Sequence, residues 1–385
     1  MRVRLKDCYR TRDFRALAKQ RLPSPIFHYI DGGADDEVTL ARNTAAFDDV
    51  DLVPNVLAGV DTIDLTTKAL GQTLGLPIFF SPTAMQRLFH HEGERAIAAV
   101  AEEFGTLFGI STIGTRSIEE MGAATTGPKM FQIYLHNDPG INEDLLARCK
   151  AANFDVLALT VDTIVAGNRE RDYLTGMTTP PRLTPRSLFS FALHPSWSID
   201  YLLRDKFDLP NVSPYLDTGS SVSSSIAQYL NKHLSREISW DDAARLAEDW
   251  AGPFVIKGVM SVDDARRAVE AGASAIMISN HGGRQLDGSR SPFDQLSSIV
   301  DAVGGEIEII VDGGIRRGTH ILKALALGAT ACSGGRFYLY ALAGGGEEGV
   351  RRATRLLRDE LERDMLLMGC RSTSDLSPAM VARRH

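Results

Sequence analysis

The stretch SNHGGRQLDG (279–288) places His281 and Arg284 three residues apart, with two glycines between them. It follows AIMI (275–278), an apolar run of the kind that forms a buried strand. An imidazole is the side chain best suited to move a proton near neutral pH, and a guanidinium matches a carboxylate in two parallel hydrogen bonds. A plain surface turn is the alternative, because glycine and asparagine are common turn residues. If the stretch is functional, it combines a proton-transfer group with an anion-binding group.

Residues that could act together with His281 and Arg284 lie at and after the end of another apolar run, VLALTVD (156–162). Asp162 ends that run, and a carboxylate that fixes the tautomer of His281 would make the imidazole a general base. Arg169 lies just beyond it. If Arg169 and Arg284 lie at the opening of the same site, the two guanidiniums favour an anionic substrate. A pair of surface arginines is the alternative reading.

Lys257 lies in the apolar run PFVIKGV (253–259). A buried ammonium is costly unless it is paired, so this lysine is either half of a structural ion pair or a functional cation beside an electron-accepting ring. Tyr29 and Tyr134 could add neutral hydroxyls, although Tyr29 could equally be a core residue.

Two glycine-rich stretches near the end of the chain each carry an arginine. They are VDGGIRRG (311–318) with Arg316, and SGGR (333–336) with Arg336. Glycines let backbone N–H groups approach a phosphate, and arginine binds phosphate in bidentate fashion. Either stretch alone could be a plain turn, but together they predict a phosphate site.

The elements that must position these residues are eight short apolar runs. They are PIFFSPTA (77–84), LFGIST (107–112), MFQIYL (130–135), VLALTVD (156–162), PFVIKGV (253–259), AIMISN (275–280), IEIIVDGG (307–314) and ACSGGR (331–336). Helical patterns such as 93–105, 141–154, 261–272 and 318–328 lie between them, and a further helix is expected from Ser239. Strand–helix alternation of this kind predicts a (β/α)8 TIM barrel with its chemistry at the carboxyl ends of the strands. The alternative prediction, a doubly wound open sheet, has less support, because no GxGxxG motif follows a first strand.

We expect one domain over 1–385, with residues 1–76 as helices that cap the barrel. Residues 163–238 are too long for an ordinary connection and hold Pro180, Pro181 and the serine-rich GSSVSSS, so they are expected to form an excursion without a core of its own. Within it, 186–207 mixes apolar and aromatic residues with basic ends. That composition fits a segment lying on a membrane surface, or a lid over the site.

Composition excludes several other classes. The net charge is −7 and the pI about 5.8, so no basic excess points to nucleic acid. We see no signal-peptide pattern and no run long enough to span a membrane. The four cysteines are widely spaced, which predicts buried thiols, a cytoplasmic location and no metal site. His90 and His91 are expected only to flank a helix start.

Taken together, these motifs resemble those of the FMN-dependent L-2-hydroxy acid oxidases and dehydrogenases, which include glycolate oxidase, L-lactate dehydrogenase and mandelate dehydrogenase. The resemblance runs through LPSPIFHYIDGGADDE, SPTAMQ, FQIYL, LTVDT, VIKGV, SNHGGRQLDG, VDGGIRRGTHILKALALGA and GGR, in family order. SNHGGRQLD is close to a diagnostic signature, and the match covers nearly the whole chain.

The resemblance implies a role for each strand end. It implies that the flavin ring is held at Pro82, Thr83, Ala84, Ser111, Gln132, Thr160, Lys257 and Ser279. It implies that Asp312 meets the ribityl chain and that Gly313, Gly314, Arg316, Gly335 and Arg336 complete the cofactor site at the phosphate. It implies that His281 is the base with Asp162 behind it, that Arg169, Arg284 and Tyr29 bind the substrate carboxylate, and that Tyr134 bonds the substrate hydroxyl.

The implied reaction oxidises a lactate- or mandelate-like 2-hydroxy acid to the 2-oxo acid. Its hydride goes to flavin N5, and a quinone, another carrier or oxygen then takes the electrons. The family also implies a homotetramer and, in some members, a peripheral place on the inner face of the cell membrane. Ile113 stands where glycolate oxidases have an aromatic residue, which predicts a pocket for a larger or more apolar side chain. Other readings are a different FMN barrel, such as a diphosphate isomerase, and a barrel that only binds a ligand.

Overall fold

The computed structural model describes residues 3–177, 184–205, 207–215 and 233–384. Within these ranges eight parallel strands close into a barrel in the order β10-β11-β4-β5-β6-β7-β8-β9. The strands are β4 (Ile78–Thr83), β5 (Phe108–Ser111), β6 (Lys129–Ile133), β7 (Val156–Thr160), β8 (Phe254–Val259), β9 (Ala275–Ser279), β10 (Glu308–Asp312) and β11 (Ala331–Gly334). Each predicted run forms one strand, because its continuous apolar sequence suits a strand covered on both faces. The (β/α)8 prediction is confirmed.

The interior of the barrel is a packed core. Side chains from alternate strand positions fill it, among them Phe79, Met130, Val156, Val255, Met277 and Ile310, all of which are buried. The hairpin of β2 (Thr67–Ala69) and β3 (Gln72–Leu74) adds Leu70 and Leu74 to this core. The Leu70 N–H donates to the Glu308 carboxylate (2.6 Å), at the first residue of β10. The amino end of the barrel is therefore plugged, and open space remains at the carboxyl ends.

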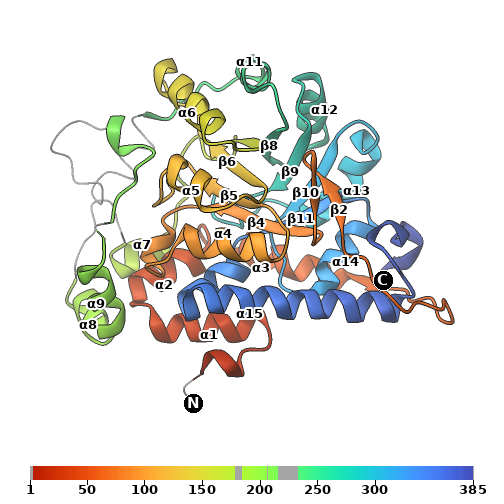
Figure 1. Cartoon of the computed structure of the whole chain (residues 1–385), viewed down its shortest axis with the longest axis horizontal. Helices are drawn as coiled ribbons and strands as arrows, with labels where there is room; N and C mark the ends of the chain where they lie inside the picture. Colours follow the sequence, from red (N-terminus) through yellow and green to blue (C-terminus); the bar gives the residue numbers. More distant parts are fainter. Residues whose placement is uncertain (1–2, 178–183, 206, 216–232, 385) are drawn as a thin grey trace.

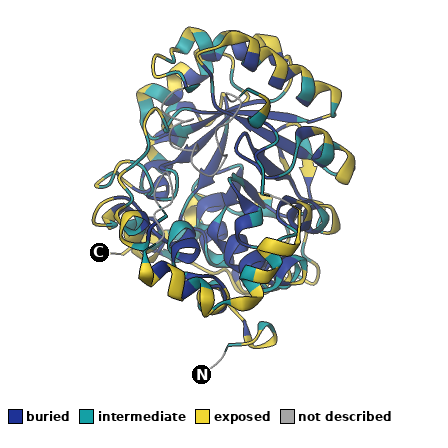
Figure 2. Cartoon of the chain, turned by 90° about the vertical axis from the view of Figure 1, so that its left-hand side faces the viewer, coloured by how far each residue is buried: buried dark blue, intermediate teal, exposed yellow. Residues whose placement is uncertain are grey.

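Helices surround the strands (Figure 1). They are α4 (Glu94–Glu103), α5 (Ile118–Ala124), α6 (Pro139–Ala151), α11 (Trp240–Trp250), α12 (Val262–Glu270), α13 (Pro292–Val303) and α14 (Gly318–Ala326). Ser239 begins α11 with a capping box, and Ser261 caps α12 by accepting from the Asp264 N–H. Figure 2 shows these helices buried on the strand side and exposed on the other.

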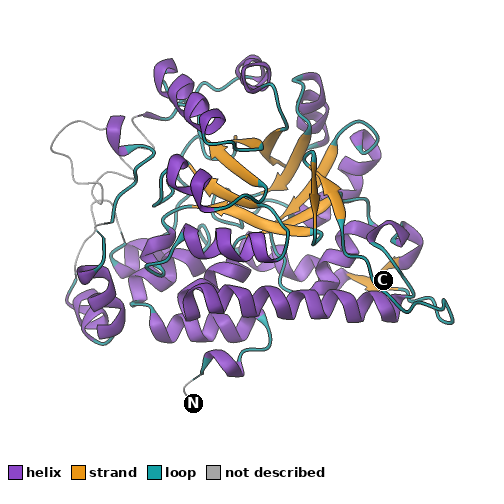
Figure 3. Ribbon diagram, in the orientation of Figure 1, coloured by secondary structure: helices purple, strands orange, loops and turns teal. Residues whose placement is uncertain are grey.

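A second layer lies under the barrel in Figure 3, where the N-terminal helices meet the long C-terminal helix. The N-terminal segment contributes α1 (Thr11–Arg21), α2 (Ser24–Asp31) and α3 (Val38–Ala45), and α1 packs along α15 (Arg336–Met368). A kink at Gly345 and Gly346 divides α15 into two parts.

Short 3-10 helices occur elsewhere in the described chain, at η1 (Leu5–Asp7), η2 (Ala46–Asp49), η3 (Gln86–Leu88), η4 (Ser213–Tyr215), η5 (Thr373–Asp375) and η6 (Pro378–Met380). Strand β1 (Val50–Leu52) pairs with β12 (Val381–Arg383), so the segment that follows the N-terminal helices is joined to the C-terminal part of the chain.

The segment between β7 and α11 contains α7 (Glu170–Thr175), α8 (Pro185–Ala192) and α9 (Pro195–Leu203). Helices α8 and α9 project from one side of the barrel in Figure 1. They leave large apolar side chains exposed, at Leu188, Phe189, Leu193, Ile199, Leu202 and Leu203. Pro180, Pro181 and the serine-rich stretch lie outside the described residues. No helix in the described chain is long and apolar enough to cross a membrane.

Candidate active site

His281 and Asp162 meet across the mouth of the barrel, from the ends of β9 and β7. His281 Nδ1 lies 3.0 Å from Asp162 Oδ1. Thr163 reinforces the pair, because its hydroxyl donates to Asp162 Oδ1 (3.0 Å) and lies 3.4 Å from His281 Nδ1. An imidazole whose Nδ1 donates to a carboxylate has Nε2 free to accept a proton. The arrangement is that of a general base with an orienting carboxylate.

The glycines of SNHGGR allow close approach at this point. His281 itself is left-handed, with φ 57°, and Gly282 and Gly283 follow with φ 67° and 73°. A Cβ on Gly283 would lie 2.6 Å from the backbone nitrogen of Leu40 in α3, and one on Gly282 would lie 2.7 Å from Arg336 Nη1. The two residues without side chains therefore let the histidine loop pack against the N-terminal helices and beside Arg336.

Burial and charge set the protonation states of the pair. Burial lowers the pKa of His281, and Asp162 opposes that shift while Lys257 adds to it. Burial alone would raise the pKa of Asp162, but Lys257 and His281 outweigh it and hold that pKa at about 2. The carboxylate is ionised and the imidazole is neutral near neutral pH, which are the states that a general base and its partner require.

Lys257 lies between two buried carboxylates. Its Nζ is 3.7 Å from Asp312 Oδ2 and 4.0 Å from Asp162 Oδ2. Asp312 also accepts hydrogen bonds from three serine hydroxyls, those of Ser81, Ser279 and Ser333. Both readings of Lys257 from the sequence are thus compatible with its position, since a paired lysine still places a cation at the cavity, which it lines.

Two arginines approach the same cavity beside Tyr29. The guanidinium carbons of Arg284 and Arg169 lie 4.9 and 5.4 Å from the centre of the Tyr29 ring. Asp172 in α7 faces Arg169 at 3.4 Å, and it also lines the cavity. Burial and the positive charge of Arg169 lower the pKa of Arg284 to about 10. A negatively charged ligand would relieve this repulsion, so the pair is suited to a carboxylate.

The two glycine-rich loops also meet here. Arg336 is buried and Arg316 is partly buried, and burial lowers the pKa of both. Arg336 donates to the carbonyls of Ile30, Gly282 and Gly32, so three of its five N–H groups bind the backbone. Arg316 donates to the carbonyl of Ile315. Arg336 also supports the site structurally, a role that the sequence analysis did not foresee.

One cavity of about 1610 Å³, including its open mouth, joins all of these groups. Of the residues predicted from the sequence, its walls include Tyr29, Pro82, Thr83, Ala84, Ser111, Tyr134, Arg169, Lys257, His281, Arg284, Asp312, Gly313, Gly314, Arg316, Gly335 and Arg336. Gln132, Thr160, Asp162 and Ser279 are not among its lining residues, although they lie at or near the carboxyl ends of β6, β7 and β9. The sequence analysis missed Met85, Phe89, Thr163, Asp172, Met177 and Gln285, which also line it. Thr163 could have been found as the direct neighbour of Asp162, whereas the others carry no local signal.

The model of the FMN-dependent dehydrogenase family matches residues 18–383. The chain belongs to this family. It is 41% identical to an L-lactate dehydrogenase of Vibrio parahaemolyticus over 95% of this chain and 96% of that protein. It is 38% identical to glycolate oxidase of Spinacia oleracea, over 96% and 94%. The solved structure of a monotopic membrane protein, (S)-mandelate dehydrogenase, superposes with a TM-score of 0.93 at 31% identity, covering 98% of this chain and all of that one.

This FMN-dependent dehydrogenase is therefore an enzyme that oxidises 2-hydroxy acids with FMN as its cofactor. Its buried polar atoms fit that cofactor. Gln132 Nε2 and Thr160 Oγ1, at the ends of β6 and β7, are buried without a hydrogen-bond partner among the described residues. Buried polar atoms are normally paired, so these two call for a ligand with its own donors and acceptors, which the edge of a flavin ring supplies.

Proposed function

We propose that the enzyme oxidises an L-2-hydroxy acid with a bulky apolar side chain to the 2-oxo acid, with His281 as the base. The observation that carries this proposal is the 3.0 Å contact between His281 and Asp162 in a cavity that also holds Arg169 and Arg284. A diphosphate isomerase would need neither the base nor this pair of arginines. A barrel that only binds a ligand would have no use for a neutral, oriented imidazole.

Each side chain then has a defined task. Arg169 and Arg284 bind the substrate carboxylate and fix the orientation of the α-carbon. Because Asp162 occupies Nδ1 of His281, Nε2 takes the proton of the substrate hydroxyl. Burial raises the pKa of Tyr134, so its phenol stays protonated and can donate a hydrogen bond to the substrate oxygen. When bound, FMN supplies the electron-accepting ring that takes up the α-hydrogen with its two electrons.

For the cofactor, we propose that different strand ends hold the ring, the ribityl chain and the phosphate of FMN, as the family resemblance implies. Pro82, Thr83, Ala84, Ser111, Gln132, Thr160, Lys257 and Ser279 surround the ring, and Asp312 lies at the ribityl chain. Gly313, Gly314, Arg316, Gly335 and Arg336 hold the phosphate. The buried Arg336 and the partly buried Arg316 support this assignment, because an anion would offset the cost of desolvating two neighbouring guanidiniums.

The apolar part of the cavity supports a bulky substrate side chain. Ile113 is buried in its wall, together with Ala84, Met85, Phe89 and Met177. The Ile113 carbonyl accepts from the Met85 N–H (3.1 Å), so its place is fixed by the backbone of the neighbouring strand end. A wall of this kind stabilises an aromatic or branched side chain better than a hydrogen or a methyl group.

The test is reduction of the enzyme-bound FMN under anaerobic conditions. We expect L-mandelate and L-lactate to bleach the flavin absorbance of the wild type, and a His281→Gln variant to keep its flavin while reduction slows by about 10²–10⁴-fold. A flavin that no 2-hydroxy acid bleaches would overturn the substrate class. Near-normal reduction of His281→Gln would overturn the base alone.

We further propose that α8 and α9 rest on a membrane surface. Their exposed leucines form an apolar face, and basic residues such as Arg186 and Arg204 flank it in the sequence. That combination favours the interface between lipid headgroups and acyl chains. The likeness to a solved structure described as a monotopic membrane protein supports the same location. The electron acceptor then meets the enzyme at or near that surface.

A further inference from the structure

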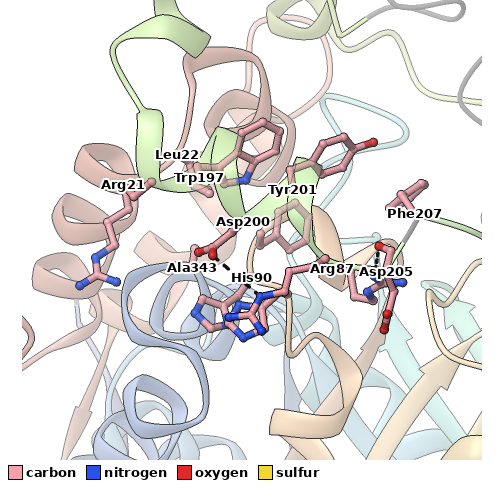
Figure 4. Close-up of a pocket in the computed structure, with 14 residues that line it drawn as sticks. Arg21, Leu22, Arg87, His90, Trp197, Asp200, Tyr201, Asp205, Phe207 and Ala343 are labelled. Atoms are coloured by element: carbon pink, nitrogen blue, oxygen red, sulfur yellow. Dashed lines mark hydrogen bonds and ion pairs between the residues drawn. The ribbon is translucent and has the colours of Figure 1, made fainter.

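A second cleft lies outside the barrel, between α9 and the chain that links β4 to α4 (Figure 4). It encloses about 650 Å³ including its open mouth. Trp197 and Tyr201 of α9 form one wall, with their rings stacked 5.1 Å apart. The indole N–H of Trp197 donates to the Leu88 carbonyl (2.8 Å), which ties α9 to the opposite side. The other wall carries His90 and His91.

Three consecutive residues beside this cleft can act as metal ligands. One ligand atom from each of His90, His91 and Glu92 lies within 4.8 Å of the other two. The two imidazole rings have their centres 4.4 Å apart and are tilted by 31°. Ligand atoms around a tetrahedral zinc ion, with bonds of about 2.0–2.1 Å, lie roughly 3.3 Å apart. Small rotations of these side chains would therefore close the set around one ion.

A purely structural reading explains part of the cluster. Glu92 Oε2 accepts the Glu347 N–H (2.6 Å) at the kink of α15, and it lies 3.3 Å from His90 Nδ1. Glu92 thus caps the second part of α15. His91 has no place in that network. Its Nδ1 is buried without a hydrogen-bond partner among the described residues, which is the feature that a metal ion would satisfy.

Helix α9 brings a fourth candidate to the same place. Asp200 lines the same cleft as His90 and His91. Its ion pair with Arg204 is long, at 4.0 Å, so little is lost if the carboxylate turns toward a cation. Two imidazoles and two carboxylates form a ligand set that zinc accepts readily.

We propose that His90, His91 and Glu92 bind a divalent transition-metal ion of the zinc type, with Asp200 as the fourth ligand. The ion joins the barrel to α9 and thereby fixes the projecting helices relative to the active site. This site is separate from the flavin cavity, and the proposal of a metal ion does not depend on the substrate proposed above.

The test is calorimetric titration of the FMN-loaded enzyme with Zn²⁺. We expect one ion per chain in the wild type, and an affinity at least about tenfold lower in His91→Ala, because losing a ligand costs no less than losing a supporting group. His194→Ala is the matched control. His194 lies between α8 and α9 with its Nδ1 close to the Ser190 carbonyl (2.7 Å), and its loss should leave zinc binding unchanged. Retained flavin absorbance checks the folding of each variant.

Three outcomes would overturn the site. They are the absence of zinc binding to the wild type, an unchanged affinity in His91→Ala, and an equal loss in His194→Ala. A separate Asp200→Asn variant tests the link to α9, and we expect it to bind zinc at least about tenfold more weakly as well. Wild-type affinity in that variant would overturn the place of Asp200.

Discussion

As the proposed base, His281 has to remain unprotonated until the substrate arrives. Burial favours the neutral imidazole, and Lys257 adds to that effect. Asp162 acts in the opposite direction, because its negative charge favours the imidazolium. In the proposed reaction, burial would keep His281 ready to accept a proton, and Asp162 would stabilise the imidazolium that results.

An Asp162→Asn variant separates these two effects. Removing the charge takes away the contribution that raises the pKa of His281, so that pKa falls further. Since activity is present above the pKa of the base and lost below it, the acidic limb of the kcat/KM profile should move to lower pH. At the same time kcat should fall, by up to the about 10²–10⁴-fold that a positioned base contributes. A pH profile of both enzymes checks this, and an unmoved limb would argue against the contact.

Ile113 should decide which substrate side chains fit. An Ile113→Phe variant fills part of the apolar wall, so we expect kcat/KM for L-mandelate to fall at least about tenfold relative to L-lactate. Ile199→Phe, on the exposed face of α9, is the matched control and should leave the ratio unchanged. Steady-state turnover of both acids gives the ratio. An unaltered preference in Ile113→Phe would place the side-chain pocket elsewhere.

At the scale of elements, two loops form the mouth of the site, and Gln285 fastens them together. Its amide donates to the carbonyls of Asp162 (2.8 Å) and Val165 (2.9 Å) and accepts from the Gly167 N–H (3.1 Å). Gly167 crosses the other loop so closely that a Cβ there would lie 2.2 Å from the Arg284 carbonyl. The loop after β7 and the loop after β9 are thus held together by hydrogen bonds and close packing.

A Gly167→Ala variant should force these loops apart. Because the clash is with backbone, it cannot be relieved by rotating a side chain. We expect KM for the hydroxy acid to rise about tenfold or more, since Arg169 and Arg284 lose their common geometry. Gly305→Ala is the control, because a Cβ on Gly305 meets nothing within 4 Å. Equal kinetics for the two variants would show that the crossing does not position the arginines.

On the scale of the whole molecule, the cavity and the exposed apolar residues of α8 and α9 lie in different places. The carboxyl ends of the barrel strands surround the cavity, while α8 and α9 project sideways and expose large apolar side chains. Leu202 and Leu203 at the end of α9 are 77% and 79% exposed. Isolated exposed leucines are ordinary, but a cluster on two adjacent helices marks a binding surface.

A flotation assay with liposomes tests that surface. We expect the wild type to float with vesicles that contain anionic lipid, and a Leu202→Ser/Leu203→Ser variant to float markedly less, since each buried leucine contributes about 1.5–3 kcal/mol. Leu366→Ser/Leu367→Ser is the control, an exposed pair at the far end of α15, 46% and 66% exposed. Equal flotation of the two variants would contradict membrane contact through α9.

Much of this architecture can be predicted from short stretches of the sequence. Each barrel strand is a short apolar run, because a strand covered on both faces excludes polar residues along its whole length. The residues at the ends of those runs were therefore predictable as a group, and the family could be identified from local motifs such as SNHGGRQLD. By itself the sequence determined the barrel, the cofactor and the class of reaction.

Other features depend on contacts between residues that are far apart in the sequence. The contact between His281 and Asp162 spans 119 positions, and no local pattern fixes its distance. The hydrogen bonds of Arg336 to backbone carbonyls could not be predicted either, nor could the presence of Asp200 and His91 in one cleft. Side-chain direction and burial follow from how distant elements pack, so only the tertiary structure decided which charged groups pair and which atoms stay unpaired.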